Sequence, residues 1–139
     1  MGNVVRGPRP KMPESEKITI NLGYVDLGHV DLMVQEGFYS NRTDFIRTAI
    51  RNQIERHADA VQQAVTRKSV DLGLRHYARE DLEAARDAGR MFHIRVLGLA
   101  SIAHDVTPEL ARATIASVAV LGALHASAAV KAALADRMR

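Results

Sequence analysis

The most regular pattern of polar and hydrophobic positions lies near the N-terminus, in residues 17–22. Three polar residues alternate with three apolar ones there: Lys17, Thr19 and Asn21 with Ile18, Ile20 and Leu22. A period of two residues predicts a β-strand with one polar and one apolar face. One strand is not stable alone, because its backbone groups need partners and its apolar face needs a core.

The apolar spacing then changes to that of helices. Leu27, Val30, Met33 and Val34 predict a first helix, and Gly37 stands where a left-handed residue ends it. A second helix is predicted from its inner face, which carries Phe45, Ile46, Ala49, Ile50 and Ile54. Asn41 can cap this helix, with Asp44 as a short-armed capping-box acid.

No second matching strand lies near residues 17–22, so we expect the same strand of another copy to pair with it. The result is a dimer around a two-stranded antiparallel ribbon. A ribbon of this kind fits the major groove of DNA, where it would present Lys17, Thr19 and Asn21 to the bases. The dimer core is then predicted to comprise Ile18, Ile20, Leu22, Leu27, Val30, Val34, Phe45, Ile46 and Ile50.

The start of the second helix is a predicted phosphate site. Its first backbone N–H groups lack partners within the helix, and the helix dipole is positive at this end. The residues around it, Ser40, Asn41, Arg42 and Thr43, are therefore predicted to contact the DNA backbone.

The stretch Gly37-Phe38-Tyr39-Ser40-Asn41-Arg42-Thr43-Asp44-Phe45-Ile46-Arg47 carries a family resemblance. Together with the strand, residues 17–57 resemble the ribbon-helix-helix DNA-binding regulators, the Arc, MetJ and CopG group. The resemblance implies a dimer that reads bases with the outward strand residues. Two positions depart from the family pattern: Gly23 weakens the start of the first helix, and Asn21 stands where arginine is common. Asn21 predicts a preference for adenine.

Residues 1–16 contain three of the four prolines and the basic residues Arg6, Arg9 and Lys11. We expect a flexible basic arm. Its cations either contact phosphates or the minor groove beside the ribbon, or the arm has no role in binding.

The C-terminal half contains a threefold pattern. Residues 58–68 are expected to extend the second helix or form a linker. In residues 69–139, a short apolar run ends near Gly73, Gly98 or Gly122, about 25 residues apart, and a helix-like segment follows each. This pattern predicts repeated strand–helix units with parallel strands in an α+β protein, and the alternative is an all-helical C-terminal half. Thr107 and Pro108 predict one helix start, and Gly89 a helix end.

Composition narrows the chemistry. Aromatic residues make up 4% and tryptophan is absent, which disfavours base stacking on single strands, whereas the net charge of +3 and pI near 9.6 suit duplex binding. There is no cysteine, and His76, His93, His104 and His125 do not have the spacing of metal ligands, so we expect no metal and no cofactor. One branch of the family that residues 17–57 resemble carries a nickel-sensing C-terminal domain, and the missing ligands disfavour that role here. No enzyme motif, signal peptide or membrane span is recognised, and a cytoplasmic, nucleoid-associated protein is expected.

We therefore expect a sequence-specific regulator, a repressor, that binds double-stranded DNA as a homodimer. Its C-terminal half would serve oligomerisation or sensing. Two alternatives stay open: an antitoxin that binds a toxin protein, and an architectural protein that multimerises along DNA.

Overall fold

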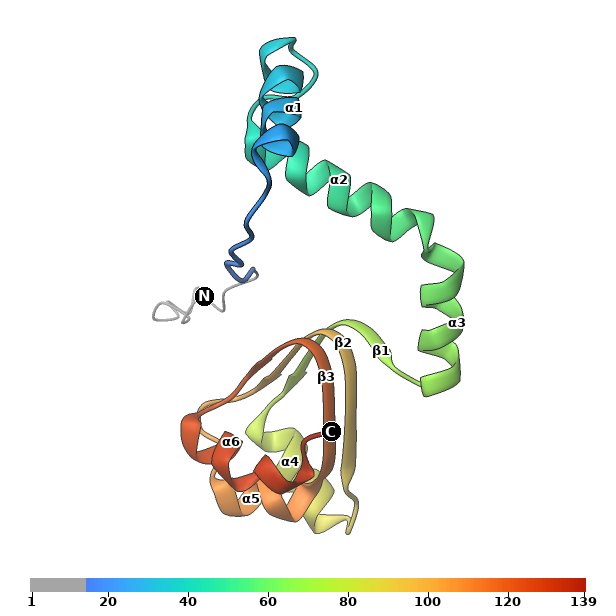
Figure 1. Ribbon diagram of the computed structural model, residues 1–139. Coiled ribbons are helices and arrows are strands. Elements are labelled where there is room, and N and C mark those ends of the chain that lie inside the picture. The colour runs from blue at the N-terminus through green and yellow to red at the C-terminus, as the bar shows by residue number, and fades with distance from the viewer. Residues whose placement is uncertain (1–14) are drawn as a thin grey trace, which may run out of the picture. The chain divides into compact units, whose positions relative to one another are not determined.

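The computed structural model describes residues 15–139, and the chain divides into two units between Arg56 and His57. The basic arm residues Arg6, Arg9 and Lys11 lie outside the described residues. The first unit contains helices α1 (Tyr24–Gln35) and α2 (Arg42–Arg56), seen in Figure 1. The second unit contains α3 (Ala58–Lys68), β1 (Asp71–Tyr77), α4 (Arg79–Asp87), β2 (Phe92–Ile102), α5 (Pro108–Thr114), β3 (Ile115–His125), α6 (Ala128–Ala133) and a 3₁₀ turn η1 (Ala135–Arg137).

The first unit has the two predicted helices and the predicted turn. Gly37 has φ of 85° just after α1, so it adopts the left-handed conformation that ends the helix. Gly23 precedes α1 and makes no side-chain cap, as expected of a glycine. Residues 17–22 form no strand within the protomer. The antiparallel ribbon stays a prediction, because its second strand would come from another chain.

Residues 58–68 form helix α3, which is separate from α2. The break falls at His57, and the C-cap of α3 is Ser69, a non-glycine residue with φ of 52°. The left-handed Ser69 turns the chain directly into β1.

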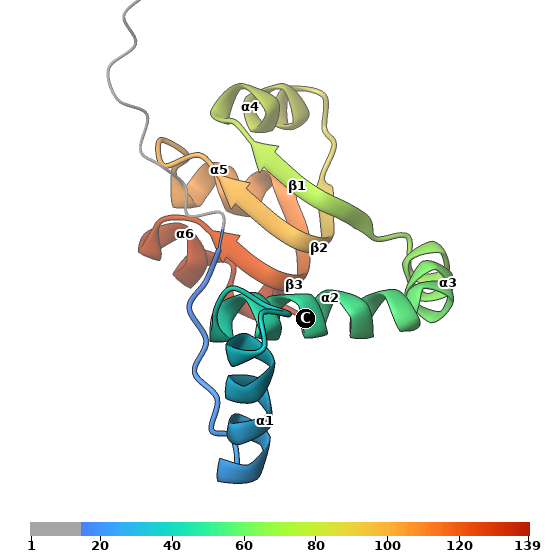
Figure 2. The same cartoon turned by 90° about the horizontal axis from the view of Figure 1, so that it is seen from above.

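The second unit alternates strands and helices three times around a parallel sheet of order β1-β2-β3. The α+β class and the strand–helix repeats are thus confirmed, and the all-helical alternative is wrong. Helices α4, α5 and α6 lie side by side along one face of the sheet (Figures 1 and 2). The core between these layers contains the fully buried Leu82, Ile94, Val96, Ile115, Val118, Val130 and Leu134.

The predicted helix ends in this unit are confirmed. Thr107 caps α5 by accepting a hydrogen bond from the Leu110 amide at 3.1 Å, and Pro108 occupies the first helical position. Gly89, with φ of 67°, follows the end of α4.

The three repeat glycines form a row across the sheet, with Gly73 beside Gly98 and Gly98 beside Gly122. Their φ angles are 115°, 137° and 119°. A Cβ on Gly98 would collide with the carbonyl oxygen of Gly73, and a Cβ on Gly122 would collide with that of Gly98. The expectation that an apolar run ends near each glycine is wrong, because every strand continues past its glycine. All three strands are arched in Figure 1.

The last residues pack along the outer edge of β3. Met138 forms a parallel bridge with Val118, and the amide of Arg139 donates to the carbonyl of Val118 at 2.8 Å. Arg112 holds the preceding turn through Asp136, at 2.8 Å. Part of this sheet edge is therefore covered by the chain itself.

Candidate nucleic-acid interface

The amphipathic segment of residues 17–22 is exposed on both faces in the protomer. Lys17, Thr19 and Asn21 are exposed, as their predicted contact with DNA requires. The apolar Ile18, Ile20 and Leu22 are also 71%, 57% and 41% exposed. A segment that leaves its apolar face uncovered within one chain needs a partner surface.

The predicted dimer core is incomplete in one protomer. Among residues 15–56, Val30 alone is buried, whereas Leu27, Val34, Phe45 and Ile46 are half-buried. Ile50 is exposed on α2. Except for Val30, these side chains keep exposed surface that a second copy could cover.

The start of α2 is ordered by two capping interactions. The Asn41 side-chain oxygen accepts from the Asp44 amide at 2.8 Å, which confirms Asn41 as the N-cap. The Asp44 carboxylate accepts from the amide of Ser40 at 2.9 Å, one residue earlier than in a standard capping box. The amides of Arg42 and Thr43 belong to the first turn, where a helix supplies no acceptor of its own.

Arg42 lies at this helix start but is already engaged. Its Nε and Nη2 atoms donate to the two carboxylate oxygens of Asp31 at 2.7 and 2.8 Å. The hydrogen bonds and charge of Arg42 lower the pKa of Asp31, and those of Asp31 raise the pKa of Arg42. This bidentate pair joins α1 to α2, so Arg42 positions the helices, and a phosphate can use only the N–H groups left on Nη1 and Nη2.

The pair was missed in the sequence because Asp31 and Arg42 lie 11 positions apart. The available signal was the presence of opposite charges on two helices joined by a short glycine turn. A helical hairpin brings such positions together.

The aromatic turn packs onto the start of α2. The rings of Tyr39 and Phe45 meet edge to face, with centroids 4.9 Å apart and an interplanar angle of 78°. Because the turn is fixed against α2, the capped helix start is held in a defined orientation to α1. The predicted phosphate residues Ser40, Asn41, Arg42 and Thr43 are thereby brought together at one end of α2.

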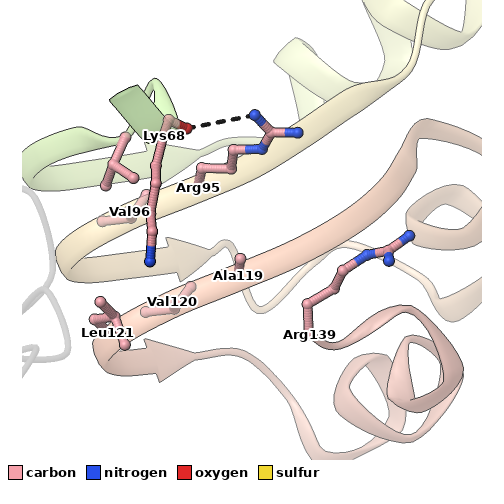
Figure 3. A pocket seen from close by; sticks show the side chains of 8 residues that line it. Lys68, Arg95, Val96, Ala119, Val120, Leu121 and Arg139 are labelled. Carbon is pink, nitrogen blue, oxygen red and sulfur yellow. Dashed lines mark hydrogen bonds between the residues drawn. The ribbon is translucent and has the colours of Figure 1, made fainter. Parts of the chain in front are cut away.

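A separate cavity of about 370 Å³ lies in the second unit. It is lined by Lys68, Val70, Arg95, Val96, Ala119, Val120, Leu121 and Arg139. Arg95 donates to the backbone carbonyl of Lys68 at 3.4 Å. The lining carries three cations, but the Lys68 ammonium and the two guanidinium groups point in different directions (Figure 3). They do not converge on one position, as a site for a single anion would require.

In residues 15–139, no group of three or more histidine and carboxylate side chains is close enough to hold a metal ion. Within the same residues, every helix is too short or too polar to cross a membrane.

An amphipathic segment, a helix, a glycine turn and a second, capped helix are together typical of a class of DNA-binding transcriptional regulators. A model of the ribbon-helix-helix transcriptional regulator family matches residues 13–131, and the chain belongs to this family. The match extends from the N-terminal unit through most of the strand–helix repeats. Comparisons with curated proteins and with solved structures give no match. The family consists of regulators and is generally non-enzymatic.

Proposed function

We propose that this regulator binds double-stranded DNA in a sequence-specific manner as a dimer. Residues 17–22 of two copies would pair into an antiparallel ribbon that enters the major groove. Bound over a promoter, the dimer would act as a repressor. The family supports DNA binding and transcription regulation, and the exposed apolar residues of the first unit support the dimer.

The observation that carries the proposal is the uncovered apolar face of residues 17–22. Burying the exposed parts of Ile18, Ile20 and Leu22 contributes roughly 2–5 kcal/mol per protomer before ordering costs, at ~1.5–3 kcal/mol for each fully buried side chain. Pairing with an identical segment covers this face and also satisfies the backbone groups of both strands. The two-fold axis of such a ribbon predicts paired half-sites in the DNA.

Base reading is assigned to Lys17, Thr19 and Asn21, which share the other face of the strand. Asn21 can donate and accept at the same time, which matches the N6 and N7 atoms of adenine. Lys17 suits guanine, and Thr19 can contact either type of base edge or a thymine methyl group.

Phosphate contact is assigned to the start of α2. The amides of Arg42 and Thr43 and the hydroxyl groups of Ser40 and Thr43 are the principal donors. The side-chain oxygen of Asn41 caps the helix, so its amide nitrogen is the atom left for a phosphate. This arrangement fixes the dimer on the DNA backbone while the ribbon reads the sequence.

Selection of bound fragments from random DNA tests this function. The wild-type protein should select two inverted half-sites that contain adenine, and Asn21→Ala should lose that adenine while sedimentation still shows a dimer. Asn52→Ala, an exposed asparagine within α2, is the matched control and should select the wild-type motif. If Asn21→Ala loses dimerisation and keeps its preference, Asn21 lies on the wrong face.

The same experiment separates the alternatives. Protection that spreads along DNA without a selected motif would favour an architectural protein. Copurification of a small toxin from the native host would favour an antitoxin. The second unit has its own buried core, whereas toxin-binding tails are commonly polar and fold on binding.

A further inference from the structure

The parallel sheet of the second unit ends in two free strand edges. Strand β2 lies in the middle, so the outer edge of β1 and part of the outer edge of β3 lack neighbours in the described chain. We propose that the β1 edge of one copy pairs with the β3 edge of another, in parallel and head to tail. The partner of this surface is thus a second copy of the same unit. The proposal does not depend on how the first unit reads DNA.

The two free edges match in length and register. Strand β1 begins at Asp71, opposite Val96, and covers only the later part of β2. Across the same part of β2, the paired residues of β3 are Val120 to His125. The earlier part of the β3 edge is occupied at Val118 by Met138 and Arg139. The chain therefore covers the part of β3 that has no counterpart in β1 and leaves open the part that does.

In the row of three glycines, each carbonyl approaches the glycine of the following strand, and the first and last glycines lack a neighbour on their outer sides in the described chain. The carbonyl of Gly73 lies where a Cβ of Gly98 would be, and the carbonyl of Gly98 lies where a Cβ of Gly122 would be. A Cβ on Gly73 would meet nothing within 4 Å in the protomer. In the proposed junction, the carbonyl of Gly122 approaches Gly73 of the next copy and repeats the spacing already present twice.

The outer face of the sheet carries a row of leucines that the junction would continue. Leu72 and Leu121, at the two edges, are 64% and 65% exposed, whereas Leu97 between them is half-buried. In the junction register, Leu121 of one copy lies beside Leu72 of the next. Each edge leucine would gain the flanking neighbour that Leu97 already has.

These edges carry few charged side chains, and those on β1 offset each other. Residues 120–125 of β3 carry no acidic, lysine or arginine side chain. On β1, Asp71 and Arg75 pair with each other at 3.6 Å, so the edge presents no excess of one sign. Natural sheet edges are commonly blunted by lysine, proline or a bulge, and none of these lies in the free part of either strand.

A head-to-tail contact has different surfaces on its two sides, so it builds an open chain of copies unless the rotation between copies closes a ring. In an open chain of contacts, each ribbon-held dimer keeps at least one β1 edge and one β3 edge free. Such dimers can join into larger assemblies and link neighbouring DNA sites. A foreign extended peptide could also add to either edge, but only a copy of this chain brings a glycine to the matching row.

A charge swap across the junction tests the proposal by sedimentation velocity of the full chain without DNA. Wild-type protein should form species above the dimer, and their fraction should rise with concentration. Leu72→Glu with Leu121→Glu places like charges side by side and should weaken this association at least about tenfold. Leu72→Glu with Leu121→Lys places opposite charges side by side and should retain it.

Both positions are exposed in the protomer, so neither pair of substitutions disturbs the core, which circular dichroism verifies. Met91→Glu, an exposed apolar residue of the same unit that lies outside the strands, is the matched control and should assemble as the wild type does. The proposal is overturned if wild-type protein never exceeds a dimer. It is equally overturned if the protein with Leu72→Glu and Leu121→Lys dissociates as readily as the protein with both leucines replaced by glutamate. That result would indicate contact between two β1 edges. Assembly unchanged in the Glu/Glu protein would place the contact elsewhere.

Discussion

Replacing Gly73, Gly98 and Gly122 by alanine separates two contributions to the free energy of unfolding: backbone strain at positive φ, and collision of the new methyl group with a neighbouring strand. All three positions have positive φ, so alanine is strained at each by about 1–3 kcal/mol. At Gly98 and Gly122 the new methyl group would also strike the carbonyl of the neighbouring glycine, which demands a backbone shift. Overpacking of this kind costs about 1–3 kcal/mol more. At Gly73 the methyl group meets open space in the protomer.

We therefore expect Gly98→Ala to destabilise the second unit by about 1–3 kcal/mol more than Gly73→Ala. Hydrogen exchange of the β2 amides measures the stability of this unit within the full chain. Samples are held dilute, so that contacts between copies do not contribute. Equal destabilisation at Gly73 and Gly98 would refute the close approach between strands and leave backbone strain as the whole explanation.

Three further predictions concern the helix start of α5, the ion pair of the first unit and the basic arm. Thr107→Ala removes the cap on the Leu110 amide and should cost about 1 kcal/mol in denaturant unfolding, whereas Thr107→Ser should cost much less; equal destabilisation would rule out the cap. The lowered pKa of Asp31 means that its pair with Arg42 stabilises the fold above the carboxyl's unfolded pKa, and this contribution disappears as pH falls through the lower folded value. Asp31→Asn should reduce the loss of stability at low pH, as measured by hydrogen exchange of the α1 and α2 amides. An unchanged loss would mean that other carboxylates cause it. Deletion of residues 2–12 should reduce the slope of log K against log salt for DNA binding by about 0.9 for each phosphate that the arm neutralises, and an unchanged slope would leave the arm without a role.

The two proposals together describe a regulator that senses spacing between DNA sites. In these proposals, a ribbon-held dimer would occupy paired half-sites, and the sheet edges of its second units would join it to the next dimer. The Glu/Glu protein should then bind an isolated site normally but lose cooperativity between neighbouring sites. A footprint across two tandem sites measures this difference, and unchanged cooperativity would remove the link between assembly and DNA binding.

Local patterns determined much of this protein. The spacing of apolar residues predicted α1 and α2, and Gly37 and Asn41 marked the turn and the cap between them, because helix ends depend on side chains within a few positions. The same reasoning found Thr107 and the threefold strand–helix pattern. The period-two stretch at residues 17–22 led to the ribbon hypothesis, although one protomer cannot contain the strand that would pair with it.

Contacts between distant residues were decided only by the tertiary structure. The pair of Arg42 with Asp31 depends on how two helices meet, so sequence alone assigned Arg42 wholly to phosphate. The three repeat glycines were expected near the ends of the strands, because a helix-like segment follows each short apolar run. In the folded sheet, every strand continues past its glycine, and at Gly98 and Gly122 only a residue without a Cβ fits against the carbonyl of the neighbouring strand. The pairing of the strands also decides that β1 shares its rows of the sheet with residues 120–125 of β3, which no local pattern could reveal.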